Sequence, residues 1–277
     1  MNPFRHLLMA AGSQPPIGTW SMSASPLVAE ALGHAGVDWG LIDMEHSPLD
    51  MGDVLHLLQA VGNTKMVPVV RVPWNDAVTV KRVLDAGAQT VMFPFVQSAE
   101  EAARAVASTR YPPHGVRGLS GMSRASHFGT TKDYPNVANK QIGVIVQLES
   151  PEALDRLDDI AAVHGVDALF VGPGDLAAGM GHVGQPMHPA VMERMTHAAR
   201  RCAELGKPIG TLGETPQAAA QYRAAGFTFV ALGADLGLLM QGAAAALGAL
   251  RGQSSDRHPD VHVHTLAEGT VVASKGR

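Results

Sequence analysis

The chain has 277 residues, of which 46% are hydrophobic and 17% charged, which is typical of a well-packed globular protein and suits one α/β barrel. Its formal net charge of −4 excludes a strongly basic surface, so we expect no nucleic-acid partner. The single cysteine, Cys202, excludes an intramolecular disulfide and a thiolate metal cage. No apolar run reaches the roughly 18 residues of a membrane span, so we expect a cytoplasmic protein without a membrane partner.

Short apolar runs alternate with Ala-rich amphipathic segments along the whole chain. The apolar runs predict strands at 17–20, 39–43, 67–71, 90–94, 142–149, 168–172, 208–212 and 228–232. The amphipathic segments predict helices near 25–35, 50–61, 76–86, 98–108, 151–161, 189–205, 216–225 and 236–250. Several helices end at a glycine just before a strand, in HAGVD, DAGAQ, ELGKP and AAGFT, which is typical of helix-to-strand turns in α/β proteins.

The pattern of the strands predicts the architecture. Strands that are apolar at successive positions are buried on both faces, which indicates a parallel sheet. Eight strand–helix units fit a closed (β/α)8 TIM barrel, and no GxGxxG motif follows the first strand, which argues against a dinucleotide-binding fold. We expect one barrel domain, 1–251, then a polar, flexible tail, 252–277, with a long functional or disordered connection at 111–141.

Polar residues gather where the predicted strands end, which in α/β barrels is the side that carries the active site. These residues are, in chain order, Asp43, Glu45, His46, Arg71, Gln147, Glu149 and Asp175. Single members have structural alternatives: Arg71 could form a structural ion pair, and Glu149 and Asp175 could cap helices. Their clustering at one end of the barrel favours a site.

Carboxylates with no cysteine or paired histidines beside them indicate a hard divalent cation such as Mg²⁺ or Mn²⁺. Two protein ligands leave positions for a chelating 2-oxo acid, whose carboxylate could bind backbone N–H groups in the turn from Gly172 to Asp175. A Schiff-base aldolase would instead need a lysine at the reactive end of a strand. Lys65 and Lys207 precede their strands, so the metal-dependent route is favoured.

Six motifs occur in the chain in this order: GTW, LIDMEH, VVRVPWND, STRYPPHGVRG, VIVQLES and LFVGPGDLAAGMG. From about Ile17 to Leu250 the sequence resembles the HpcH/HpaI family of class II pyruvate aldolases. The resemblance implies that Glu149 and Asp175 bind Mg²⁺, Mn²⁺ or Co²⁺, and that a 4-hydroxy-2-oxo acid, such as 4-hydroxy-2-oxoheptanedioate, is cleaved to pyruvate and an aldehyde. It also implies a homohexamer with exchanged C-terminal helices, and 236–250 is apolar nearly all round, consistent with burial against another subunit.

The resemblance also implies roles for the other matching residues. Arg71 would contact the keto oxygen and stabilise the enolate. His46, oriented by Asp43 and supported by Glu45, would be the acid/base that acts on the 4-hydroxyl. The remaining matches would hold pyruvate (Gln147, Gly172 and Gly174), form the pocket wall (Trp20 and Leu212) or reach a neighbouring subunit's site (Asp85).

The chain departs from the family pattern at two places, and two other functions stay open. Relatives often carry Ala or Ser in place of Gly174, and some carry apolar or small residues in place of Glu214, which bears on the preference for the aldehyde. One alternative is a related metal-dependent lyase or decarboxylase acting on oxaloacetate or on a CoA thioester, whose diphosphate Arg117 and Arg124 could contact. The other is a non-catalytic metabolite-binding barrel.

Overall fold

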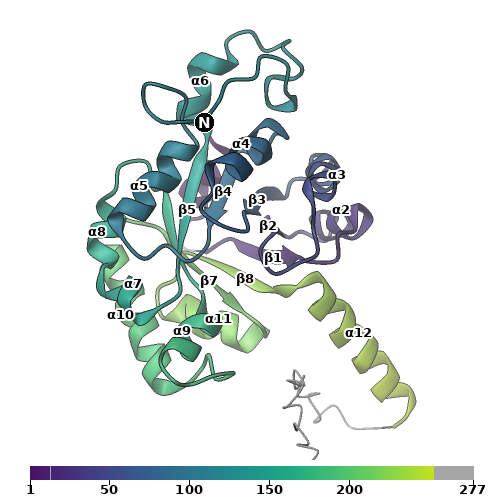
Figure 1. The fold of residues 1–277 in the computed structure, drawn as a ribbon. Helices are drawn as coiled ribbons and strands as arrows, with labels where there is room; N and C mark the ends of the chain where they lie inside the picture. Colours follow the sequence, from purple (N-terminus) through teal and green to yellow (C-terminus); the bar gives the residue numbers. More distant parts are fainter. Residues whose placement is uncertain (13, 253–277) are drawn as a thin grey trace, which may run out of the picture. The chain divides into compact units, whose positions relative to one another are not determined.

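The computed structural model, which describes residues 1–12 and 14–252, is built around a closed parallel barrel (Figure 1). Each strand pairs with the next along the chain, and the last pairs with the first. The strands are β1 (Ile17–Ser21), β2 (Trp39–Asp43), β3 (Val67–Arg71), β4 (Thr90–Phe93), β5 (Gly143–Leu148), β6 (Ala168–Val171), β7 (Ile209–Gly213) and β8 (Phe229–Ala234). The predicted TIM barrel is therefore confirmed, with every strand within two residues of its expected position.

Helices precede, connect and follow the strands along the chain. They are α1 (Pro3–Ala10), α2 (Pro26–His34), α3 (Met51–Val61), α4 (Ala77–Asp85), α5 (Ala99–Ser108), η1 (Arg124–Ser126), α6 (Tyr134–Gln141), α7 (Pro151–Asp155), α8 (Leu157–Ala162), α9 (Pro173–Gly179), α10 (Pro189–Glu204), α11 (Pro216–Ala224) and α12 (Asp235–Leu250). Several begin at a Ser, Thr or Asp whose side chain accepts a backbone N–H of the first turn, for example Ser25, Asp76 and Thr215.

Three features of the helices differ from the sequence prediction. The expected helix at 151–161 is two short helices, α7 and α8, separated at Arg156. The connection at 111–141, expected to be a loop, contains η1 and α6. The short helices α1 and α9 were not predicted as separate elements.

The barrel interior is filled by aromatic side chains. Trp39 at the start of β2 is fully buried and packs edge-on against Phe4 of α1 and Phe229 of β8, with ring centroids 5.9 and 5.7 Å apart. Glycine makes room for this packing, since a Cβ on Gly18 would lie 2.1 Å from Cε2 of Trp39. Because Trp39 and Phe229 begin their strands, this cluster closes the N-terminal end of the barrel and leaves the other end for a site.

The C-terminal part of the chain is described by itself. Residues 1–12 and 14–238 belong to one compact unit, and α12 from Leu239 onward belongs to a second. Within α12 several large apolar side chains are exposed, namely Leu236, Leu239, Met240, Leu247 and Leu250. Apart from Gly252, the tail predicted at 252–277 lies outside the described residues. None of the described helices is both long and apolar enough to cross a membrane.

Candidate active site

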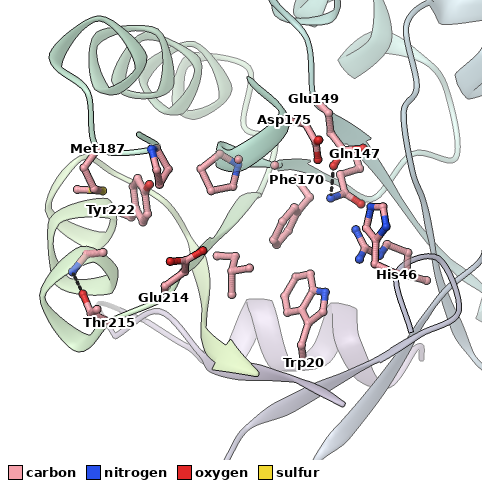
Figure 2. A pocket seen from close by; sticks show the side chains of 17 residues that line it. Trp20, His46, Gln147, Glu149, Phe170, Asp175, Met187, Glu214, Thr215 and Tyr222 are labelled. Carbon is pink, nitrogen blue, oxygen red and sulfur yellow. Dashed lines mark hydrogen bonds between the residues drawn. The ribbon is translucent and has the colours of Figure 1, made fainter. Parts of the chain in front are cut away.

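A cavity of about 260 Å³ opens where the strands end, on the side of the barrel opposite the aromatic cluster of Phe4, Trp39 and Phe229 (Figure 2). Loops and strand ends from six of the β/α units contribute to its lining: Trp20, His46, Arg71, Gln147, Glu149, Phe170, Gly172, Pro173, Gly174, Asp175, Pro186, Met187, Leu212, Glu214, Thr215, Ala218 and Tyr222. The strand-end residues singled out in the sequence thus meet around one cavity, with Asp43 and Glu45 directly behind it.

Arg71 is the cation at the centre of the polar residues. Its Nε and Nη2 atoms donate to the fully buried carboxylate of Asp43 at 2.9 and 2.7 Å, and Nη1 lies 2.9 Å from Oε2 of Glu45. Its Cζ lies 5.7 Å from the centre of the Trp20 ring. Burial alone would lower the pKa of Arg71, but the hydrogen bond and negative charge of Asp43 outweigh it and raise the pKa. The two hydrogen bonds to Asp43 use two of its five N–H groups, and the contact with Glu45 is an ion pair, so N–H groups remain for a ligand.

The geometry around His46 differs from the expected dyad. The Asp43 carboxylate accepts the backbone N–H groups of Glu45 and His46, at 3.0 and 3.3 Å, and does not contact the imidazole. The carboxylate nearest the imidazole is Glu45, whose Oε2 lies 3.9 Å from Nε2 of His46. The His46 side chain is 62% exposed at the cavity mouth, where it can reach a ligand.

Glu149 is the most strongly perturbed carboxylate of the cavity. It is 4% exposed, with Oε1 accepting from Nε2 of Gln147 at 2.7 Å and Oε2 accepting the backbone N–H of Phe95 at 3.0 Å. Burial raises the pKa of Glu149 to about 8, assisted by the negative charges of Glu45 and Asp175 and opposed by Arg71. Burial also raises the pKa of Glu45, with the charges of Asp43 and Asp175 adding to the increase and Arg71 and His46 opposing it.

Asp175 and Glu149 do not act as helix caps. Gly172 is the residue before α9, and Asp175 lies exposed in the first turn of that helix, on the cavity lining. The cap of α7 is Ser150, whose side chain accepts the N–H of Ala153. The structural alternatives for these two carboxylates therefore do not apply.

The donor atoms at this end of the cavity fit a hard divalent cation. Besides the carboxylates of Glu149 and Asp175, the buried Oε1 atom of Gln147 has no hydrogen-bond partner among the described residues. All are oxygen acceptors, the ligands that Mg²⁺ and Mn²⁺ prefer. Within residues 1–12 and 14–252, no group of three or more His, Cys, Asp or Glu side chains is arranged to hold a metal, so a cation here would take its other ligands from water or substrate.

Asp85, expected to reach a neighbouring subunit's site, and the two arginines considered for a CoA diphosphate lie outside this cavity. Asp85 is not part of the lining and binds Nη2 of Arg117 at 2.9 Å. Arg117 is itself buried, with its Cζ 4.5 Å from the centre of the Tyr111 ring, and Arg124 donates to the backbone oxygen of Ala86. Arg117 is therefore not free to contact a CoA diphosphate.

Several lining residues were not found from the sequence, namely Phe170, Pro186, Met187, Thr215, Ala218 and Tyr222. Phe170 points inward from β6, which the inward alternation of that strand could have indicated. The others come from the α9–α10 loop and from α11, where no strand end marks them.

Comparison with known proteins gives consistent results. The sequence profile described as HpcH/HpaI aldolase/citrate lyase matches residues 16–242. The chain is 48% identical to a 2-dehydro-3,6-dideoxy-6-sulfogluconate aldolase of Pseudomonas putida and 48% identical to a 5-keto-4-deoxy-D-glucarate aldolase of Salmonella arizonae, in each case over 87% of this chain and 94% of the relative. A crystal structure of an HpcH/HpaI aldolase/citrate lyase family protein from Burkholderia cenocepacia has a TM-score of 0.87 and 43% identity, covering 91% of this chain and 100% of that chain.

Proposed function

The chain belongs to the HpcH/HpaI aldolase/citrate lyase family, and we propose that it is a divalent-metal-dependent aldolase that cleaves a 4-hydroxy-2-oxo acid to pyruvate and an aldehyde. The expected class of enzyme, a carbon–carbon lyase, agrees with the aldolases among its relatives. The observation that carries the proposal is the meeting of Glu149, Asp175, Arg71 and His46 around one cavity.

We assign the cation to Glu149 and Asp175, with Mg²⁺, Mn²⁺ or Co²⁺ as the candidates. When bound there, the ion would supply Lewis-acid polarisation of the 2-oxo group and charge compensation for the carboxylates. The N–H groups of Gly174 and Asp175 in the first turn of α9 would donate to the carboxylate end of the substrate, and the unpartnered amide oxygen of Gln147 would accept from a water beside it.

The side chains of the chain itself account for the proton and charge transfers. His46 removes the proton of the 4-hydroxyl, and the oxygen lone pair forms the aldehyde C=O as the C3–C4 bond breaks. The electrons of that bond form the C2–C3 double bond of the enolate, whose oxygen accepts from the free N–H groups of Arg71. Return of a proton to C3 releases pyruvate.

The residues around this centre hold it in position and keep water out. Asp43 and Glu45 fix the Arg71 guanidinium from behind, which aims its remaining donors into the cavity. Trp20 and Leu212 form apolar walls, and in this low-dielectric setting the charge of Arg71 acts more strongly on a developing oxyanion.

The test is pyruvate release from a set of 4-hydroxy-2-oxo acids by a coupled assay, first in EDTA and then with added Mg²⁺, Mn²⁺ or Co²⁺. We expect release only with metal, and loss of release in Arg71→Ala. Glu193→Gln, which neutralises an exposed carboxylate on α10, is the matched control and should behave like the native protein. Undiminished release in EDTA, or near-native turnover of Arg71→Ala, would refute the proposal.

We further propose that the protein acts as a homo-oligomer, in which α12 packs against another copy and Asp85 approaches a neighbouring site. The resemblance to the family implies that this oligomer is a hexamer. The exposed apolar side chains of α12, Leu239 and Met240 among them, support burial in an assembly. Sedimentation velocity tests this, because a monomer at micromolar concentration would contradict it.

A further inference from the structure

The cavity has two ends of different chemistry (Figure 2). The end described above holds Glu149, Asp175 and Gln147, with the guanidinium of Arg71 and the imidazole of His46 also in the lining. At the opposite end Glu214, from the turn after β7, and Tyr222, from α11, face the cavity, and Thr215 lies beside them in the lining. No step of the proposed cleavage uses these three residues, so their chemistry bears on the part of the substrate that becomes the aldehyde.

The position of Glu214 is fixed by the backbone on both sides. Gly213 ends β7 so close to α11 that a Cβ on it would lie 2.5 Å from the backbone N of Ala219. Thr215 caps α11, with its hydroxyl oxygen accepting the N–H of Ala218 at 3.1 Å. Glu214 is thus held between a tight turn and a capped helix, and its side chain points into the cavity (Figure 2).

Tyr222 supplies a hydroxyl beside this carboxylate. Its ring is buried against Phe227, with centroids 5.7 Å apart. Burial raises the pKa of Tyr222 to about 12, and the negative charge of Glu214 contributes to the increase. The phenol therefore stays protonated at neutral pH and can donate to a substrate oxygen, while Glu214 can only accept.

The charge at this end is negative and uncompensated. Glu214 forms no ion pair with any side chain in the part of the chain that the structure describes. The lining's one guanidinium, Arg71, is paired with Asp43 and Glu45, and His46 lies at the end of Glu149 and Asp175 (Figure 2). A terminal carboxylate or sulfonate on the substrate would meet Glu214 without a counter-ion, whereas hydroxyl groups could donate to Glu214 and accept from Tyr222.

We infer that the aldehyde half of the substrate is an uncharged hydroxyaldehyde, recognised by Glu214 and Tyr222, and that Glu214 rejects an acidic end group. This rests on the proposed aldolase function and names its substrate class. The names of the two aldolases compared above describe substrates with a second acidic group, a sulfo group in one and the second carboxylate of a glucarate in the other. This chain would therefore favour a different aldehyde.

Two aldehydes of matched shape test the inference in the direction of synthesis with pyruvate. Glyceraldehyde and tartronate semialdehyde differ only in having CH2OH or a carboxylate at the end away from the aldehyde. We expect the native protein to use glyceraldehyde with a kcat/KM about tenfold higher or more, since a tenfold ratio corresponds to about 1.4 kcal/mol of repulsion between like charges. Added salt should narrow the ratio.

Variants assign the preference to one side chain. Glu214→Gln keeps the shape and removes the charge, so the ratio should approach one. Glu214→Arg should reverse it in favour of tartronate semialdehyde, and Glu193→Gln should leave it unchanged. A native protein that uses both aldehydes equally, or prefers the acidic one, would overturn the inference, as would an unchanged ratio in Glu214→Gln.

A separate readout distinguishes this inference from the proposed function. Exchange of the pyruvate methyl protons with deuterium, followed by NMR without any aldehyde, reports enolate formation alone. No enzyme-dependent exchange with any of the three metals would mean that the proposed function fails. Exchange together with no discrimination between the two aldehydes would mean that only the assignment of Glu214 fails.

Discussion

Gly172 lies between the end of β6 and the first turn of α9, beside the side chain assigned to the metal. A Cβ at this position would lie 2.4 Å from Oε1 of Glu149 and 3.0 Å from its Cγ, closer than real Cβ atoms approach other heavy atoms. The backbone is not the obstacle, because its φ of −82° is one that alanine adopts readily. Gly172→Ala should therefore act by displacing the Glu149 carboxylate.

The expected effect on activity follows from the size of that displacement. To restore ordinary contact at about 3.5 Å, the Glu149 carboxylate must move by about 1 Å. It would then stretch its bonds to Nε2 of Gln147, now 2.7 Å, and to the N–H of Phe95, now 3.0 Å. A displacement of about 1 Å of a catalytic group costs about a hundredfold in rate, so we expect kcat/KM for pyruvate release to fall by about that factor.

Gly174→Ala is the matched control, two residues further along the same turn. A Cβ at Gly174 meets no atom within 4 Å, so we expect kcat/KM to stay within about twofold of the native value and stability to be unchanged or improved. Near-native kcat/KM in a folded Gly172→Ala protein would refute the role given to Glu149. Equal losses in both variants would point to the backbone of the turn in place of the carboxylate.

Three further predictions concern stability. In EDTA the pKa of Glu149 is raised to about 8, against an ordinary 4.5. Between these two pH values the folded state keeps a proton that the unfolded chain releases. The free energy of unfolding should therefore fall as pH rises from 4.5 to about 8. Melting temperatures measured between pH 6 and pH 8 should show this decrease in stability, and Glu149→Gln should remove most of the pH dependence. Added Mn²⁺ should stabilise the native protein more at pH 8 than at pH 6. Trp39→Ala should cost about 3–5 kcal/mol in urea denaturation, against about 0.5 kcal/mol for exposed Trp74→Ala. Asp43→Asn should destabilise by about 3–5 kcal/mol because it removes the carboxylate that makes both hydrogen bonds to the buried Arg71 charge and leaves only the Glu45 ion pair. A double-mutant cycle with Arg71→Met should be strongly non-additive, and additive effects would contradict the pairing.

The barrel could be predicted because each β/α unit carries its own local signals. The glycines of HAGVD, DAGAQ, ELGKP and AAGFT are Gly36, Gly87, Gly206 and Gly226, and they have φ values of +99°, +104°, +64° and +104°. These are left-handed conformations that end a helix and lead into a strand, so residue type and position indicate the turn without knowledge of the rest of the fold.

The short helices could not be predicted, because tertiary contacts stabilise them. The side chain of Asn2, before α1, donates to the backbone oxygens of Gln89 and Gln141. Arg5 within α1 binds Asp167, with Nε 2.7 Å from Oδ1. Helices of eight residues are marginal by propensity alone, and these partners lie more than 80 residues away in the sequence.

The partners of the site residues were also only partly predictable. The ends of the predicted strands indicated the residues, but the resemblance to a family suggested Asp43 as the partner of His46. The register of the barrel explains the observed pairing, because Asp43 ends β2 directly opposite Arg71 at the end of β3. Residues at matched positions on neighbouring parallel strands point the same way, so the two predicted strand ends already contained this contact.

The balance of charge connects the fold with the proposed chemistry. Asp43 takes the two side-chain hydrogen bonds of Arg71, and the Glu149 carboxyl is not ion-paired with it. Without metal, burial and the neighbouring carboxylates keep Glu149 protonated up to a pH of about 8, and a bound divalent cation would replace that proton, so the buried carboxyl is also the one that provides affinity for metal. At the other end of the cavity, Glu214 is a single carboxylate with no second carboxylate beside it to share a metal ion. Its negative charge would therefore act on the substrate. The pyruvate end thus sets the reaction, and the aldehyde end decides which substrate undergoes it.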